Sequence, residues 1–196
     1  GTAEFPAVIE NCTACHDGQG QAITWSDAAA YDRERFWEKP LLKAPFIEAN
    51  CYRCHIEPLA QTPSYAFGKE IFEGSGCIGC HVVRGSGGNT GPELSLVADV
   101  SRHVKVPSPP HHDLVERFNR NETVAYLFES VKWPDAQPTQ TKMPQFNLSD
   151  EEATALVVYL KSFGRRATAT GLLPPPKPVL PPTDVVERGR VLYAQH

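Results

Sequence analysis

The sequence is short of positive charge and of long apolar runs. Its 19 lysines and arginines are outnumbered by 23 aspartates and glutamates, so the net charge is -4. We expect no nucleic-acid partner, because no basic stripe is present to neutralise phosphates. No run of about 18 or more apolar residues occurs, so we expect no transmembrane segment in this chain. The sequence also starts at Gly1 without a charged and then apolar leader, so a signal peptide was removed or the numbering begins inside a longer chain.

The two sulfur-containing residue types, methionine and cysteine, are also restricted in this sequence. Methionine occurs once, at Met143, and no cysteine lies outside one short repeated pattern. All six cysteines belong to Cys-x-x-Cys-His motifs, so none is left for a disulfide or a reactive thiol. The first motif contains Cys12, Cys15 and His16, the second Cys51, Cys54 and His55, and the third Cys77, Cys80 and His81.

This pattern is typical of covalent haem attachment. The two thiols form thioether bonds with the porphyrin, and the adjacent imidazole is the proximal iron ligand. A zinc site built from the second and third motifs would leave Cys12 and Cys15 without a partner pair and the three histidines unexplained. A redox dithiol would need a βαβ context, which does not surround these motifs. We therefore predict three covalently bound haem c groups.

Residues 1–62 hold the first two motifs and few aliphatic side chains. One helix is expected near residues 26–38, before Pro40 and Pro45 break the pattern. A segment this short cannot build an ordinary core from side chains alone, and two haems would supply the missing apolar mass. We therefore predict a haem-cored dihaem segment over residues 1–62.

Apolar residues within 63–166 recur at the spacing expected for a helical domain. Helices are expected at 65–72 and within 114–133, where residues 119–121 mark a break. The clearest helix follows Ser149, which forms a capping box with Glu152. The inward stripe of that helix consists of Ala153, Leu156, Val157 and Leu160.

The last part of the chain is rich in proline and then helical. Residues 167–183 read as a stiff polyproline-II linker. Residues 184–196 resume a helical pattern.

Residues 64–163 resemble a class I cytochrome c domain. The resemblance is carried by Gly68-Lys69-x-Ile71-Phe72, the third motif, Gly91-Pro92-x-Leu94, Lys142-Met143-Pro144 and the helix from Leu148-Ser149. It implies a fold class that is mainly α with much irregular structure, a class I cytochrome c-like domain (63–166) preceded by the dihaem segment. It also implies that the Pro92 carbonyl holds the N–H of His81 and that Met143 is the distal iron ligand. A lone methionine can instead fill a core, but its place before a capped helix favours ligation.

Residues 8–60 resemble the dihaem segment of periplasmic multihaem cytochromes associated with membrane quinol-oxidising complexes. The matching segments are 12–20, 37–42 and 46–51. In that family a histidine often precedes the tryptophan of the second segment, whereas Phe36 stands here, so one distal ligand is unassigned. Residues 184–196 resemble the first helix of another class I domain, which predicts a further haem domain beyond His196; the alternative is an ordinary C-terminal helix.

The first two haems need distal ligands that the N-terminal segment does not supply. His103, His111 and His112 all lie in one insertion, residues 101–113. We predict that this insertion folds back over the N-terminal haems and supplies one or two axial ligands; the alternative is three solvent-exposed histidines. The sequence does not distinguish His111 from His112. His/Met ligation raises the reduction potential, so the third haem should have the highest potential of the three.

The function predicted from these features is electron transfer by a triheme c-type cytochrome. The chain would be a soluble carrier or the haem arm of a respiratory complex, with redox proteins as partners and no enzymatic activity of its own. The alternative is a multihaem redox enzyme, of the peroxidase or nitrogen- or sulfur-oxyanion type, with one open haem. The acidic balance favours a partner with a basic docking face. Haem is attached covalently outside the cytoplasm, so a periplasmic or extracytoplasmic location is expected.

Overall fold

The computed structural model describes residues 15–18, 24, 41–53, 55, 58–99, 107–136, 141–164, 187–188 and 190–191. Several sequence predictions lie outside these residues. They concern the helix near 26–38, the proline-rich linker, and the side chains of Cys12, Cys54, His103 and His196.

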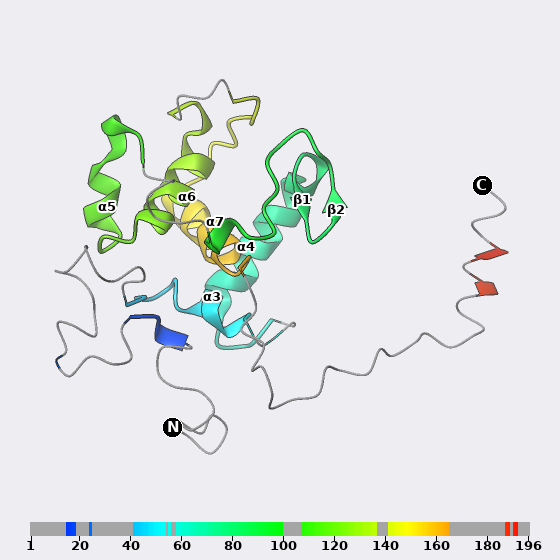
Figure 1. Cartoon of the computed structure of the whole chain (residues 1–196), viewed down its shortest axis with the longest axis horizontal. Coiled ribbons are helices and arrows are strands. Elements are labelled where there is room, and N and C mark those ends of the chain that lie inside the picture. The colour runs from blue at the N-terminus through cyan, green and yellow to red at the C-terminus, as the bar shows by residue number, and fades with distance from the viewer. Residues whose placement is uncertain are drawn as a thin grey trace, which may run out of the picture.

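The described part of the chain is mainly helical (Figure 1). Its only described sheet is a two-stranded antiparallel hairpin in which Val82 pairs with Gly87. This confirms the expected helical fold class in its coarse form. The α-helices are α3 (Glu48–Cys51), α4 (Pro63–Gly74), α5 (Asp113–Arg117), α6 (Glu122–Lys132) and α7 (Asp150–Lys161); the strands are β1 (Val82–Val83) and β2 (Ser86–Gly87). Short 3-10 turns are η1 (Cys77–Gly79), η2 (Val97–Asp99), η3 (Pro109–His111) and η4 (Pro134–Ala136).

Helices α4 and α7 cross at the centre of the molecule and form its main contact (Figure 1). At the crossing Gly68 lies directly against the backbone of α7, and a Cβ built on Gly68 would be 1.9 Å from the carbonyl oxygen of Ala155. The two backbones can approach this closely because residue 68 has no side chain. The predicted inward stripe of α7 is buried here, with Ala153 and Val157 both 0% exposed.

Preferences of residues that are neighbours in the sequence set both the start of α7 and the break before α6. Ser149 Oγ accepts from Glu152 N at 3.1 Å while Ser149 N donates to Glu152 Oε2 at 2.7 Å, so the predicted capping box is confirmed. The break predicted at 119–121 is also confirmed. Asn119 and Arg120 have φ of 52° and 59°, and the Asn121 side chain caps α6 by accepting from Val124 N.

Residues 41–53 pack onto the helical domain. Phe46 contacts Phe118 edge to face, with ring centroids 5.5 Å apart, and Ala49 is fully buried. Glu48 Oε2 accepts from Tyr65 N at 2.8 Å, so a carboxylate of α3 satisfies a free backbone donor in the first turn of α4. This part of the N-terminal segment therefore shares one side-chain core with α4 and α7. The division of the chain at residues 62/63 stays a prediction.

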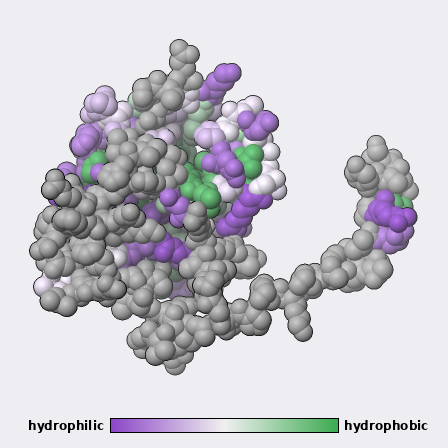
Figure 2. Space-filling model, in the orientation of Figure 1, coloured by the Kyte–Doolittle hydropathy of each residue, from purple (hydrophilic) through white to green (hydrophobic). Residues whose placement is uncertain are grey.

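The described surface is mostly polar, with small scattered apolar spots (Figure 2). The large apolar side chains exposed there are Phe67, Ile78, Leu96 and Val191. None of the described helices has the length and apolar character needed to cross a membrane.

Two glycines of α4 test the helix crossing. We expect Gly68→Ala to lower the free energy of unfolding by about 1–3 kcal/mol, because the added methyl group overpacks the contact with Ala155. Gly74→Ala is the matched control, since a Cβ there meets no atom within 4 Å. It should leave stability unchanged or raise it by up to about 1 kcal/mol through helix propensity. Denaturant unfolding of the haem-loaded chain measures both, and equal stability of the two variants would contradict this account of the crossing.

Candidate haem site

The third motif follows α4 directly. The helix ends at Gly74, Gly76 adopts φ of 68°, and the chain turns through η1 so that Cys77 is half-buried and Cys80 exposed. Neither cysteine forms a disulfide. Burial raises the pKa of the Cys77 thiol above its usual value.

The imidazole of His81 is held by the backbone that follows the hairpin. His81 Nδ1 lies 2.7 Å from the carbonyl oxygen of Pro92, the contact that the class I resemblance implies. A carbonyl only accepts, so Nδ1 carries the proton and Nε2 keeps the lone pair that a metal needs. Gly91 lies against the face of the ring, and a Cβ there would be 2.7 Å from His81 Cε1. The backbone therefore fixes both the tautomer and the position of the ring.

An apolar cleft with a cavity volume of about 110 Å³ opens beside His81. Met143, which is half-buried, and His81 both line it. The other lining residues come from α4, α6, α7 and the segments between them: Phe72, Ser75, Cys77, Pro92, Leu94, Val97, Tyr126, Leu127, Ser130, Val131, Phe146, Leu148, Leu156 and Leu160.

The residues of the cleft fit a covalently attached haem. The Cys77 thiol, an oriented imidazole and a thioether line a space whose other walls are almost entirely apolar, and Cys80 follows three residues after Cys77. When bound there, such a group supplies a reversible one-electron change between Fe³⁺ and Fe²⁺. The protein contributes the fixed imidazole, the apolar walls and restricted access of water.

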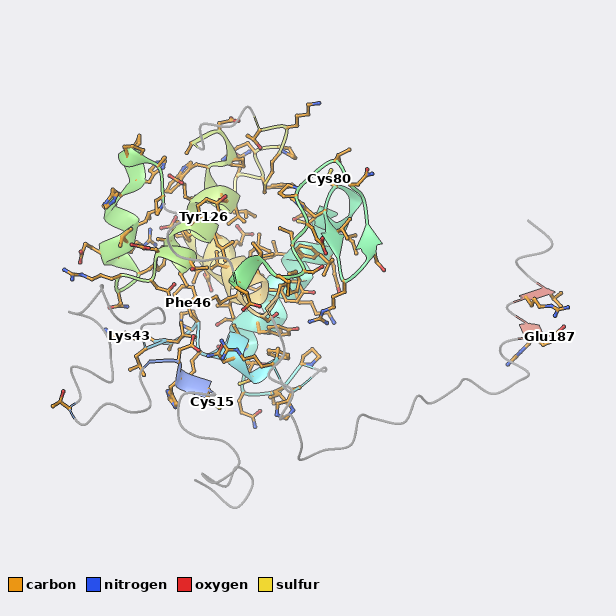
Figure 3. All side chains as sticks on the ribbon, viewed as in Figure 1. Cys15, Lys43, Phe46, Cys80, Tyr126 and Glu187 are labelled. Carbon is orange, nitrogen blue, oxygen red and sulfur yellow. The ribbon has the colours of Figure 1, made fainter. Side chains whose placement is uncertain are left out.

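The first two motifs lie side by side in the described residues. Asn50 Nδ2 donates to the carbonyl of Cys15 at 2.8 Å, and Leu42 N donates to that of His16 at 2.9 Å. Arg53 forms a 3.1 Å ion pair with Asp17, whose side chain is only 3% exposed. Figure 3 shows Cys15 and Cys80 on opposite sides of the described helices. His16 is exposed and His55 half-buried.

The two described histidines of the insertion have different surroundings. His111 Nδ1 is 2.8 Å from Glu129 Oε1, and the His111 ring stacks on Trp133 with centroids 4.4 Å apart. His112 is exposed. The contacts of His111 therefore tie it to the end of α6, and its predicted ligation of an N-terminal haem stays a prediction.

Glu129 is a residue that sequence reasoning missed. It is fully buried, and its carboxylate accepts from Ser108 N at 2.9 and 3.0 Å as well as from the Ser108 hydroxyl. The available signal was its position within α6, where a charged residue stands among buried neighbours such as Phe128. Charged residues are rarely buried without partners, so this position predicts a polar cluster.

Comparison with known sequences agrees with this geometry. The profile of the family described as "Cytochrome c" matches residues 65–164, which is just over half of the chain. The chain belongs to the cytochrome c family. The protein is therefore a c-type cytochrome that transfers electrons through covalently bound haem c.

Related curated proteins share the same part of this cytochrome. The C subunit of nitric oxide reductase from Paracoccus denitrificans is 33% identical over 104 residues, covering 50% of this chain and 58% of the relative. The protein of the same name from Stutzerimonas stutzeri is 31% identical, covering 51% and 58%. That from Cereibacter sphaeroides is 30% identical, covering 59% and 69%. The chain thus spans a little over half the length of the first two relatives. No solved structure matches it significantly.

These relatives correct one prediction. The sequence predicted a protein without an enzymatic role, and this is wrong because the relatives are subunits of an enzyme, nitric oxide reductase. The prediction considered this chain only by itself, and the sequence of a single component has no residue pattern that names its complex. Haem-based electron transfer remains the function of the cytochrome domain itself.

Replacing Met143 tests the distal side of the cleft. We expect Met143→Ala to retain its attached haem but to lose the weak long-wavelength absorption of Met-ligated ferric haem, and the highest reduction potential should fall. Phe146→Leu is the control, since Phe146 lines the same cleft three residues away and offers no ligand. Optical spectra and potentiometric titration measure both variants. Survival of the absorption in Met143→Ala would rule out ligation by this residue.

Proposed function

We propose that the chain is the multihaem electron-transfer subunit of an enzyme complex of the nitric oxide reductase type. It receives single electrons and passes them to the subunit that reduces the substrate. The observation that carries the proposal is the apolar cleft with His81 fixed by Pro92 and with Met143 on its wall. That cleft lies within the family match and belongs to a chain similar to the C subunits of nitric oxide reductases.

The proposed third site is built from four residues. Cys77 and Cys80 carry the thioether bonds, His81 is the proximal ligand and Met143 the distal ligand. The thioether of methionine favours the reduced iron, so this site has the highest potential in the chain. Electrons that enter elsewhere therefore collect here.

The proposed first and second sites form a pair. Cys12, Cys15 and His16 hold one haem, and Cys51, Cys54 and His55 hold the other. The hydrogen bonds from Asn50 and Leu42 and the Asp17–Arg53 ion pair support this pairing, because they join the two attachment segments directly. The buried carboxylate of Asp17 satisfies the guanidinium of Arg53, so separating the segments would leave a charge unpaired.

The distal ligands of this pair remain assigned to the insertion that bears His103, His111 and His112. Of the two adjacent histidines we favour His111. Metal-ligating histidines commonly donate their second N–H to a carboxylate, and Glu129 occupies that position at His111 Nδ1. His112 has no such partner among its described contacts.

The partner and location follow from the same proposal. The proposed location is the periplasm or another extracytoplasmic compartment, because haem is attached covalently outside the cytoplasm, and the proposed setting is a respiratory chain. The partner is a membrane-bound redox subunit. Because this chain has a net charge of -4, the docking face of the partner should be basic.

Counting haems tests the multihaem proposal. The intact chain, produced with a haem-attachment system, should show a mass that corresponds to three haems by mass spectrometry. Replacing the cysteine pairs of the three motifs by serine, one pair at a time, should remove one haem in each case. A native mass corresponding to one haem would contradict the proposal, because the family match accounts only for the third motif.

Isolating the chain from its source tests the enzyme complex. A tagged full-length chain should copurify with a membrane-bound subunit, and anaerobic addition of nitric oxide should oxidise its reduced haems. The variant Cys77→Ser/Cys80→Ser, which lacks the third haem, should bind the same partner but stay reduced. Copurification without nitric oxide-dependent oxidation would contradict the proposed enzyme type.

A further inference from the structure

Four aromatic rings connect the second attachment motif to the third haem cleft. We propose that Tyr52, Tyr65, Tyr159 and Phe72, here called the aromatic bridge, are the contact route by which electrons pass between these two sites. The inference rests on the proposed function, because it requires a haem at the second motif as well as at the third.

The bridge begins inside the second motif. Tyr52 follows Cys51 directly and is only 2% exposed. Its ring stacks on that of Tyr65 with centroids 3.3 Å apart and planes 8° from parallel. The phenol oxygen is fixed by Thr62 Oγ1 and accepts from Leu59 N at 3.0 Å. A ring attached to the motif is therefore held in face-to-face contact with helix α4.

The bridge continues through the α4–α7 crossing to the cleft. The Tyr65 ring lies 5.2 Å from that of Tyr159, and the Tyr159 ring lies 5.3 Å from that of Phe72, both between centroids. These spacings are those of touching aromatic rings. Phe72 is 4% exposed and lines the cleft together with Cys77 and His81. The four rings thus form one unbroken series of contacts from the second motif to the third.

Electron transfer between two separated haem sites is faster where the atoms between the sites are in contact. Tunnelling weakens steeply with distance, and it weakens faster across empty gaps than through bonded or touching atoms. One electron leaves the iron at one site and reaches the iron at the other, while no bond forms or breaks and no proton moves. The rings stay in one charge state throughout, and burial raises the pKa of Tyr159 to about 12, so its phenol remains neutral.

A second aromatic series provides a built-in comparison. Phe46 contacts Phe118, which contacts Phe128, and that ring approaches Trp133. This series also joins residues 41–53 to the helical domain, but its rings do not line the haem cleft. Loss of Phe46 therefore weakens the docking of the N-terminal segment without interrupting the aromatic bridge.

The experiment compares three variants of the full haem-loaded chain. After a flash of photoreductant, optical spectra follow electron redistribution between the Met-ligated haem and the others. Tyr65→Leu removes the ring between Tyr52 and Tyr159 and should slow redistribution severalfold. Tyr65→Phe keeps the ring and should retain the native rate. Phe46→Leu removes a ring of the other series and should also retain the native rate.

The outcomes separate the two proposals. Mass spectrometry of each variant first gives the number of haems, and fewer than three in the native chain means that the proposed function itself fails. With three haems present, a native rate in Tyr65→Leu overturns the bridge. Equal slowing in Tyr65→Leu and Phe46→Leu also overturns it, because docking rather than the ring series would then set the rate.

Discussion

The contact on which the rest of the structure depends is the close approach of α4 and α7 at Gly68 and Ala155. Side chains flank this close approach in two layers, which Tyr159 joins by contacting both Tyr65 and Phe72. One layer, with Phe72 and Leu156, faces the haem cleft. The other, with Tyr65, faces the N-terminal segment. One backbone contact therefore supports both the haem cleft and the N-terminal segment, and a close-packed interior of this kind has low compressibility.

The side of the cleft that holds His81 is formed by residues that are close together in the sequence. The third motif, the turn after α4 and the Pro92 carbonyl lie within a short stretch of chain. Contacts within this stretch orient His81. Met143 lies on a later segment, which leads into the capped helix α7. Local contacts therefore position the proximal histidine, whereas the position of the expected distal ligand depends on the complete fold.

Local features of this protein could be predicted from sequence, and features that depend on tertiary contact could not. The capping box at Ser149 and the break at Asn119 follow from the preferences of a few neighbouring residues. The burial of Glu129 and the stacking of Tyr52 on Tyr65 depend on segments that meet only after folding. The Cys-x-x-Cys-His motifs were recognisable because attachment chemistry dictates their spacing, whereas the proposed enzyme complex was not predictable from them, since it depends on other chains.

The carboxylate of Glu48 at the start of α4 has a consequence for where the helical domain could be cut. Pro63 lacks an N–H, and the next donor but one, Tyr65 N, is satisfied from the preceding segment. A cytochrome domain cut at residue 63 would begin with that donor unsatisfied. Residues 41–53 thus belong to the same folding unit as α4 and α7.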